Sequence, residues 1–226
     1  MQIKTILVTG ASRGVGFEVC KKAAAQGHRV IALSRNIKSL QGLDNIDSHS
    51  VDLTIEAQIT KCVAEIKSAN TSIDVLINNA GSFINKPFLE TTTSEFEEVY
   101  KVNLFAAAAL TRLLLPMLKH TGHVLNITSM GGVQGTVKFP GLSAYSSSKG
   151  ALSILTELLA EEFKEKGPAF NALALGAVQT EMLAEAFPGY EAPVSAQQMG
   201  DYILNFALTA HQFYNGKVLP ISSTTP

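Results

Sequence analysis

The chain has 226 residues, of which 46% are hydrophobic and 16% are charged. This length and apolar content fit a folded protein with an ample core and exclude a disordered chain. The 18 basic and 19 acidic residues give a formal net charge of −1, which leaves no excess of positive charge to neutralise a phosphate backbone or an anionic membrane surface. We therefore expect neither nucleic acid nor a membrane among its partners.

Short apolar runs alternate with longer helical patterns along the chain. In chain order the sequence predicts a strand at residues 3–9, a helix at 17–26, strands at 29–33 and 48–51, a helix at 55–68, a strand at 73–77, a long helix at 92–117, a strand at 123–128, a helix at 143–166, and strands at 169–175 and 217–221. The strands are apolar without alternation, which is typical of a parallel sheet covered on both faces. No linker or repeat divides the series, so residues 1–226 are predicted to form a single α/β domain with a sheet of about seven strands.

The long predicted helix carries two further signals. Thr92 and Glu95 have the spacing of a capping box. An apolar stripe follows at steps of three or four, comprising Phe96, Tyr100, Asn103, Ala107, Leu110, Leu114 and Met117. Within residues 102–118, Asn103, Arg112 and Pro116 interrupt the apolar run, so it falls short of the roughly 20 residues that cross a bilayer. We interpret it as a buried helix and, with no charged leader before the first strand, expect a cytoplasmic location.

Cysteine, histidine and paired glutamate side chains show no functional pattern. Cys20 and Cys62 lack partners at metal-ligand spacing, and we interpret both as core thiols, so no metal site is predicted. Neighbouring glutamates at 97–98 and 161–162 diverge around their helices and are expected to be solvated. The histidines are all expected at the surface or as capping residues: His28, His49, His120, His123 and His211.

A glycine-rich turn joins the first predicted strand to the first helix. Gly10, Gly14 and Gly16 allow a sharp turn and a close approach to a ligand, and amide groups at the helix start can bind a pyrophosphate. Their Gly-x-x-x-Gly-x-Gly spacing differs from the more common Gly-x-Gly-x-x-Gly dinucleotide fingerprint. Taken alone, the pattern is also open to interpretation as a tight turn without a ligand.

Four further motifs occur in a compatible order. Asn78-Asn79-Ala80-Gly81 follows the fourth strand, Asn103 interrupts the apolar stripe, Ser129 follows a strand, and Tyr145 precedes Lys149 by one helical turn. With the glycine turn, they make the sequence resemble the classical short-chain dehydrogenase/reductase (SDR) family over residues 3 to about 180, with a weaker trace at the last strand. The resemblance implies a single-domain, Rossmann-type doubly wound sheet that binds NAD or NADP beyond the carboxyl ends of its strands.

The resemblance also implies contacts to the cofactor. The adenosine, pyrophosphate and channel contacts would come from Gly10, Ser12, Arg13, Gly14, Val15, Gly16, Asp52, Leu53, Asn79, Ala80 and Gly81. The nicotinamide end would be held by Gly176, Val178 and Thr180, and its ribose by Lys149 beside Tyr145. For Asp52, a cap or turn residue without a ligand is the alternative.

The end of the second strand bears on the choice of cofactor. NAD-preferring proteins usually place a carboxylate there for the ribose hydroxyls, whereas this chain has Ser34 followed by Arg35. Arg35 and Arg13 can form charge-assisted hydrogen bonds with a 2′-phosphate. NADP(H) is therefore expected over NAD(H), with solvated surface arginines as the alternative.

The predicted reaction centre consists of Asn103, Ser129, Tyr145 and Lys149. The resemblance implies that Tyr145 protonates a carbonyl oxygen as hydride arrives, while Ser129 hydrogen-bonds the same oxygen. An adjacent ammonium and an oxidised nicotinamide would favour the phenolate of Tyr145. A buried Asn103 amide needs hydrogen-bond partners; the resemblance places it in a water-linked relay with Lys149, and a purely structural role is the alternative.

Two features depart from the family pattern. Leu175-Gly176 replaces the usual Pro-Gly, so a turn stiffened by proline is lost before the predicted nicotinamide contacts. Ser129 and Tyr145 lie 16 positions apart, wider than usual, so the loop at 130–142 should shape the substrate mouth. The short tail is expected to leave an open site or one that a partner subunit closes.

The sequence thus predicts an NADPH-dependent carbonyl reductase, or the alcohol dehydrogenase run in reverse, with a ketone, aldehyde or secondary alcohol as substrate and a 3-oxoacyl thioester as one candidate. The alternative is a catalytically silent nucleotide-binding sensor or scaffold of the same fold. An epimerase of the extended family is disfavoured by the glycine spacing and the chain length. The low charged fraction and the Ala106–Ala109 run predict an oligomer, because they give the long helix more apolar surface than one core-facing stripe requires. The resemblance implies that this helix and the one after Tyr145 pack against their copies in a homodimer or homotetramer.

Overall fold

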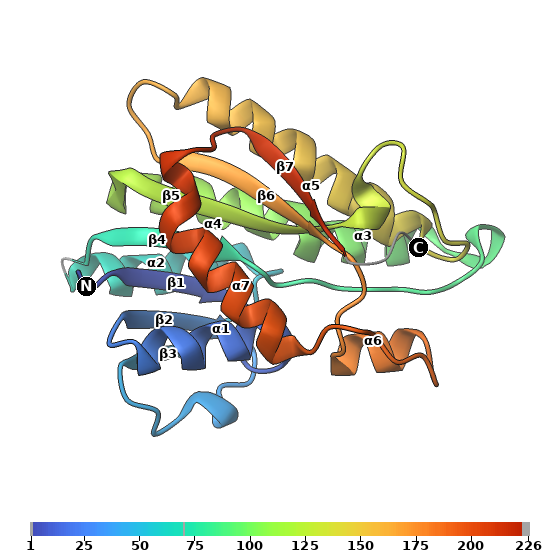
Figure 1. Ribbon diagram of the computed structural model, residues 1–226, viewed down its shortest axis with the longest axis horizontal. Coiled ribbons are helices and arrows are strands. Elements are labelled where there is room, and N and C mark those ends of the chain that lie inside the picture. The colour runs from blue at the N-terminus through green and yellow to red at the C-terminus, as the bar shows by residue number, and fades with distance from the viewer. Residues whose placement is uncertain (1, 70, 223–226) are drawn as a thin grey trace.

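A parallel sheet of seven strands forms the centre of the molecule in the computed structural model, which describes residues 2–69 and 71–222 (Figure 1). The strand order is β3-β2-β1-β4-β5-β6-β7. The strands are β1 (Thr5–Thr9), β2 (Arg29–Ser34), β3 (Ile46–Ser50), β4 (Ile73–Asn78), β5 (Leu118–Ser129), β6 (Ala169–Leu175) and β7 (Lys217–Ile221). All neighbours pair in parallel, so the carboxyl ends of the strands meet at one edge. The predicted doubly wound sheet is confirmed.

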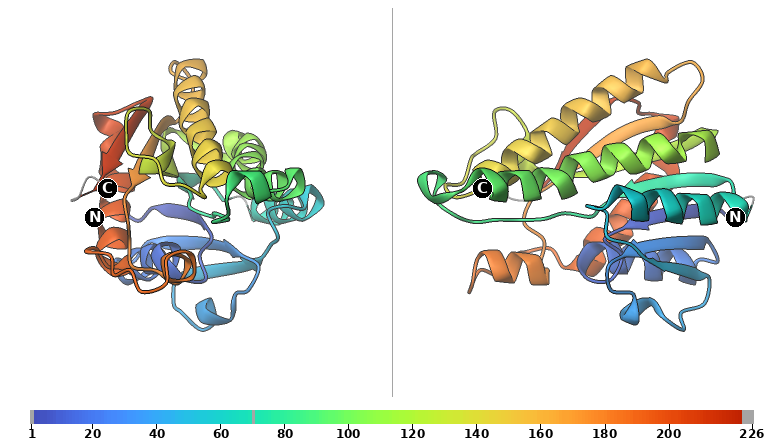
Figure 2. Two further views of the ribbon diagram at one scale, coloured as in Figure 1. Left: turned by 90° about the vertical axis from the view of Figure 1, so that its right-hand side faces the viewer. Right: turned by 180° about the vertical axis from the view of Figure 1, so that it is seen from behind.

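Helices cover both faces of the sheet because alternate strand residues point to opposite sides. On one face, Ile6 and Val8 pack with α1 (Gly14–Ala25) and α7 (Ala196–Thr209). On the other, Leu7 and Leu76 pack with α2 (Glu56–Ser68), α4 (Ala107–Leu114) and α5 (Ser143–Glu162). Figure 2 shows this second layer from behind. The predicted core thiols Cys20 and Cys62 are both buried, one in each layer.

The long helix predicted at 92–117 is interrupted. It comprises α3 (Thr93–Tyr100), a π-helical turn (Lys101–Ala106), α4 and a short 3₁₀ turn (Leu115–Met117). The predicted capping box at Thr92 and Glu95 is confirmed. The predicted stripe holds in part: Asn103, Leu110 and Leu114 are buried, whereas Phe96, Tyr100, Ala107 and Met117 are half-buried. Val99 and Ala106 are buried at neighbouring positions, and the 3.6-residue spacing does not apply across Lys101–Ala106, because a π turn is wider than an α turn.

The same helical stretch bears on the membrane prediction. Taken as Thr93–Met117, it has 25 residues and is long and apolar enough to cross a membrane by length and composition alone. Residues 102–118 were expected to be too short an apolar run to cross a bilayer, but the longer stretch Thr93–Met117 is not too short by this criterion. Leu110 and Leu114 of this stretch are fully buried in the layer with α2 and α5, and core helices commonly pass the same test.

Buried polar groups lie near the amino edge of the sheet, and they correct the histidine prediction. His28 and His123 are only 1% and 0% exposed, not at the surface. His123 Nδ1 lies 2.9 Å from the Ala207 carbonyl oxygen, and its Nε2 lies 3.0 Å from Asn171 Nδ2. Asp74 is also buried and accepts a 2.7 Å hydrogen bond from Lys119 Nζ. Local sequence gave no sign of these long-range partners.

Candidate active site

The glycine turn lies at the carboxyl edge, between β1 and α1. Gly10 and Gly14 have φ values of +66° and +56°, a region that side chains rarely adopt. A Cβ on Gly10 would lie 2.8 Å from Ala80 Cα, and a Cβ on Gly16 would overlap the Gly10 carbonyl oxygen. The turn therefore needs glycine because it packs directly against the end of β4.

The Asn78-Asn79-Ala80-Gly81 motif holds this turn through hydrogen bonds. Asn79 Nδ2 donates to the carbonyl oxygens of Thr9 and Gly10 at 3.0 and 3.3 Å. Thr9 Oγ1 in turn accepts from the backbone N–H groups of Asn79 and Ala80, both at 3.0 Å. Thr9 was not among the predicted site residues, although its place before Gly10 at the end of β1 was a usable signal.

The start of α1 fits a dinucleotide pyrophosphate. No side chain caps this helix, and its first turn contains no acidic residue. The first backbone N–H groups of a helix have no partner within it, and they carry the positive end of its dipole. The glycine turn and this uncapped terminus together form an anion-binding corner where the sequence predicts the cofactor.

The two arginines predicted to bind a 2′-phosphate each lie beside a carboxylate. Ser34 Oγ at the end of β2 donates to Ser12 Oγ at 2.8 Å, which joins this strand to the glycine turn. Arg13 Nη1 lies 3.0 Å from Glu185 Oε1. Arg35 lies close enough to Asp52 to contribute to the lowered pKa of that carboxyl group, whose main cause is the hydrogen bond from the Thr54 backbone.

Asp52 serves as a turn residue in this structure. Its Oδ1 accepts from the backbone N–H of Thr54 at 2.9 Å and from the Thr54 hydroxyl at 2.7 Å. This arrangement matches the turn interpretation that the sequence left open. Contact between Asp52 or Leu53 and an adenine stays a prediction.

Three predicted reaction-centre residues meet at the carboxyl edge. Ser129 ends β5, and its hydroxyl hydrogen-bonds the Tyr145 side chain near the start of α5. Lys149 lies one turn further along α5, with Nζ 5.9 Å from the centre of the Tyr145 ring. Thr128, the neighbour of Ser129 in β5, instead donates its hydroxyl to the Leu173 carbonyl oxygen at 3.4 Å.

Burial is the main cause of the shifted pKa values of Tyr145 and Lys149. Burial raises the pKa of the phenol, and the Ser129 hydrogen bond offsets this only in part. These contacts favour the neutral phenol, and the phenolate expected beside both an ammonium and an oxidised nicotinamide stays a prediction. Lys149 Nζ donates to the Ile127 carbonyl oxygen at 2.8 Å, and burial lowers the pKa of Lys149 from 10.5 to about 8.

Asn103 lies within the π turn and is 1% exposed. Its Oδ1 accepts from the Ser82 backbone N–H at 2.7 Å, and its Nδ2 donates to the Ser82 carbonyl oxygen at 3.0 Å. Nδ2 also donates to Ser148 Oγ at 2.9 Å. Asn103 therefore joins α5 to the segment after Gly81, which satisfies the structural requirement; the water-linked relay stays a prediction.

The predicted nicotinamide end is shaped by the segment after β6. The Gly176 backbone N–H donates to the Ile221 carbonyl oxygen at 2.8 Å, which ties this turn to β7 despite the missing proline. Val178 is buried. Thr180 Oγ1 accepts from the Leu183 backbone N–H at 3.2 Å and so caps α6 (Glu181–Ala186), a role that local sequence did not indicate.

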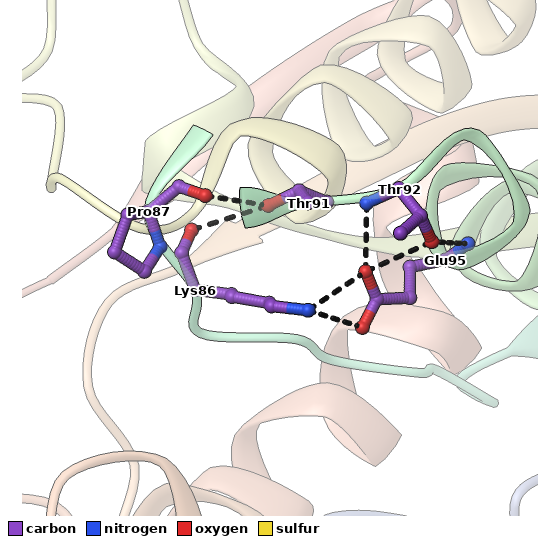
Figure 3. A network of polar contacts seen from close by, with 5 residues as sticks. All are labelled: Lys86, Pro87, Thr91, Thr92 and Glu95. Atoms are coloured by element: carbon purple, nitrogen blue, oxygen red, sulfur yellow. Dashed lines mark hydrogen bonds and ion pairs between the residues drawn. The ribbon is translucent and has the colours of Figure 1, made fainter. Parts of the chain in front are cut away.

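The segment after Gly81 borders the reaction centre and is fixed at its far end. Lys86 Nζ contacts Glu95 Oε1 at 3.0 Å, and Glu95 also accepts from the Thr92 backbone N–H at 2.7 Å (Figure 3). The Lys86 backbone N–H donates to the Gly141 carbonyl oxygen at 3.0 Å, which ties this segment to the loop at 130–142. Phe83 packs edge-on against Tyr145, with ring centres 5.2 Å apart.

A family profile described as short chain dehydrogenase matches residues 4–191. The chain belongs to the short-chain dehydrogenase/reductase family. It is thus an oxidoreductase of the kind that acts on CH–OH and C=O groups, and the sequence-based family prediction is confirmed.

Several SDR relatives are similar over most of their length. The chain is 34% identical to 3-oxoacyl-acyl-carrier-protein reductase FabG of Aquifex aeolicus, over 81% of this chain and 77% of that protein. It is 31% identical to a tropinone reductase homolog of Arabidopsis thaliana, over 96% and 90% of the two chains. Among solved structures, 4-hydroxyisoleucine dehydrogenase complexed with NADH matches with a TM-score of 0.87, 25% identity and 97% coverage of both chains.

Proposed function

We propose that this SDR protein is an NADP(H)-dependent carbonyl reductase, or the corresponding alcohol dehydrogenase, with Tyr145 as its acid and base. The observation that carries the proposal is the meeting of Ser129, Tyr145 and Lys149 at the carboxyl edge, beside the uncapped start of α1. A proton donor, an oxyanion donor and a cation are the groups that a carbonyl reduction needs.

Each residue has a distinct task in this mechanism. The nicotinamide, when bound, supplies the hydride for reduction or accepts it in oxidation. Tyr145 holds the proton that the carbonyl oxygen receives, and the raised pKa keeps the phenol protonated until then. Ser129 donates a hydrogen bond to the same oxygen. Lys149 would leave the Ile127 carbonyl oxygen to bind the ribose and would favour the charged form of Tyr145 once the proton has moved.

The residues around the cofactor corner fit NADP(H). Arg13 and Arg35 can bind a 2′-phosphate, and Ser34 stands where NAD-preferring proteins usually have a carboxylate. Gly10, Ser12, Gly14, Val15 and Gly16 would surround the pyrophosphate and the adenosine. Resident NADP(H) would thus lie across the carboxyl edge of β1 and β4, with its nicotinamide towards Gly176, Val178 and Thr180.

A 3-oxoacyl thioester is one candidate substrate. The relatives include two that are named as ketoacyl reductases, FabG of Aquifex aeolicus and HetN of a Nostoc strain, each 34% identical to this chain. A panel of ketones, aldehydes and 3-oxoacyl thioesters, followed by loss of NADPH absorbance, tests this candidate. Turnover of simple ketones but of no thioester would count against it.

The proposal is tested by the variant Tyr145→Phe, assayed on the best carbonyl of that panel. We expect kcat to fall by at least 100-fold, since the general acid is lost, while NADPH binding stays within about twofold. Undiminished turnover would contradict the role of Tyr145. An absence of wild-type turnover with retained NADPH binding would instead favour the sensor or scaffold, and higher kcat/KM with NADH would contradict the NADP(H) assignment.

A further inference from the structure

The contact between Arg13 and Glu185 joins the predicted phosphate corner to α6. Arg13 immediately precedes α1 and is predicted to bind the 2′-phosphate, yet its Nη1 lies 3.0 Å from Glu185 Oε1. Both side chains are more than half exposed, at 53% and 66%, so water and a nucleotide can reach the pair. A guanidinium cannot form its most favourable bidentate hydrogen bonds with a phosphate while one of its nitrogen atoms is bound to a carboxylate.

The position of Glu185 is set by contacts that do not involve Arg13. Thr180 caps α6 at its start, and Asn85 Nδ2 donates to the Ala186 carbonyl oxygen at its end, at 3.1 Å. Phe187, just beyond α6, packs edge-on against Phe83 with ring centres 6.1 Å apart. α6 is therefore held at the carboxyl edge from both ends (Figure 1), so its carboxylates stay near the glycine turn.

A second carboxylate of α6 also faces the glycine turn. Glu181 lies one turn before Glu185, and its Oε2 is 3.6 Å from where a Cβ on Gly14 would lie. Of the two, Glu185 contacts the arginine, whereas Glu181 lies over the start of α1. Their effects on a nucleotide should differ accordingly: Glu185 should act on the 2′-phosphate, and Glu181 on the pyrophosphate.

We infer that Glu185 is a cofactor-specificity residue that competes with the 2′-phosphate of NADP(H) for Arg13. The inference rests on the proposed NADP(H) function. A nucleotide with the 2′-phosphate must displace the Glu185 carboxylate from Arg13, whereas a nucleotide without it leaves the pair intact. Glu185 therefore lowers the advantage of NADP(H) over NAD(H) that Arg13 provides.

The expected size of the effect follows from the exposure of the pair. Exposed ion pairs contribute little to stability, and a competing pair of this kind corresponds to about a two- to fivefold change in affinity. The change should shrink as salt is raised, because screening weakens both the pair and the phosphate contact.

The test measures binding of two probes that differ only in the phosphate, 2′,5′-ADP and 5′-AMP, by isothermal titration at low salt. In Glu185→Gln, which keeps the shape of the side chain, we expect 2′,5′-ADP to bind about two- to fivefold more tightly and 5′-AMP to be unchanged. In the Arg13→Ala background, the same substitution should alter neither affinity. The matched control Glu181→Gln should leave the ratio of the two affinities as it is in the wild type.

The outcomes separate the inference from the proposed function. An unchanged ratio in Glu185→Gln, or a change that persists without Arg13, overturns the role of Glu185 while leaving the reductase proposal intact. A wild-type protein that prefers NADH in turnover contradicts the NADP(H) proposal, yet an Arg13-dependent change in the probe ratio would still support the competition. Failure of 2′,5′-ADP to bind the wild-type protein overturns both. A thermal melt of each variant confirms that it is folded.

Discussion

Lys149 is the site residue whose protonation state should be visible in kinetics. Burial lowers the pKa of this ammonium from 10.5 to about 8. The charged form is needed to bind the ribose, so kcat/KM for NADPH should fall as the pH rises through about 8, since this parameter reports the free protein. The pH profile of initial rates at saturating carbonyl measures it.

The variant Lys149→Arg is the control for that profile. A guanidinium stays charged at all accessible pH values. We expect lower activity overall, because the fork does not reproduce the ammonium geometry, but no loss of kcat/KM between pH 7 and 9. A wild-type profile that stays flat over the same interval would exclude Lys149 as the titrating group.

His123 should make the stability of the folded protein depend on pH. Burial lowers the pKa of this imidazole from 6.5 to about 4. Between these values the unfolded chain binds more protons than the folded one, so the free energy of unfolding falls as the pH falls from 6.5 to 4. The share of His123 is on the order of 3 kcal/mol at pH 4 relative to pH 7.

Urea unfolding at pH 4.5 and pH 7 measures this share. His123→Gln should reduce the difference between the two pH values, at the cost of stability at pH 7, where the hydrogen bonds to Ala207 and Asn171 are disturbed. His120→Gln, at an exposed position, should keep the full difference. An equal difference in both variants would show that His123 does not bear the titration.

The identities of the site residues could be predicted from sequence, but their partners could not. Ser129 and Tyr145 lie at element ends, where local pattern indicates exposure at the carboxyl edge. The ion pair of Arg13 with Glu185 spans 172 positions, so only the folded chain reveals it. The burial of His123 was not predictable from local sequence either, because its partners Asn171 and Ala207 come from β6 and α7.

At the scale of elements, the capping box of α3 offers a measurable contribution. Thr92 Oγ1 accepts from the Glu95 backbone N–H at 3.3 Å, and the Glu95 carboxylate returns to the Thr92 backbone (Figure 3). Thr92→Ala should lower the free energy of unfolding by about 1 kcal/mol, because helix N–H groups lose their acceptor. Thr93→Ala, at the first helical residue, should change it by less than half as much. Equal losses in urea unfolding would contradict the capping role.

The elements themselves were largely predictable. Apolar runs located most strands of the sheet, but β3 (Ile46–Ser50) is largely polar and begins two residues before the predicted 48–51, and β5 begins at Leu118, five residues before the predicted start. The π turn at Lys101–Ala106 was not predictable from apolar periodicity, because a period of 3.6 residues assumes an unbroken α-helix. A polar residue within the apolar stripe, Asn103, was a visible sign of this turn in the sequence, because its side chain forms hydrogen bonds with the Ser82 backbone there.

At the scale of the whole molecule, exposed apolar side chains bear on the predicted assembly. On α5, Ile154 and Leu158 are 57% and 62% exposed, and Phe105 in the π turn is 56% exposed. We expect light scattering to give at least twice the chain mass of 24.1 kDa. Leu158→Glu should reduce that mass, because a charge would be buried in the interface.

Leu89→Glu provides the matched control for the assembly. Leu89 is 95% exposed and lies outside α5. The same change of chemistry there should leave the mass as in the wild type. A monomeric wild-type protein would contradict the predicted oligomer, whereas an oligomeric mass that is unaltered in Leu158→Glu would contradict only the placement of Leu158 in the interface. Whether residues 1–226 fold as a single domain also stays a prediction, although one sheet spans β1 to β7.

The parallel sheet separates two kinds of constraint within one molecule. Ser129, Asn79 and the glycine turn gather at the carboxyl edge, whereas His123 and Asp74 lie near the amino edge. We therefore expect a substitution near the amino edge to change the tolerance of acid more than the chemistry at the carboxyl edge. Stability and reaction chemistry should then be adjustable separately when this chain is engineered.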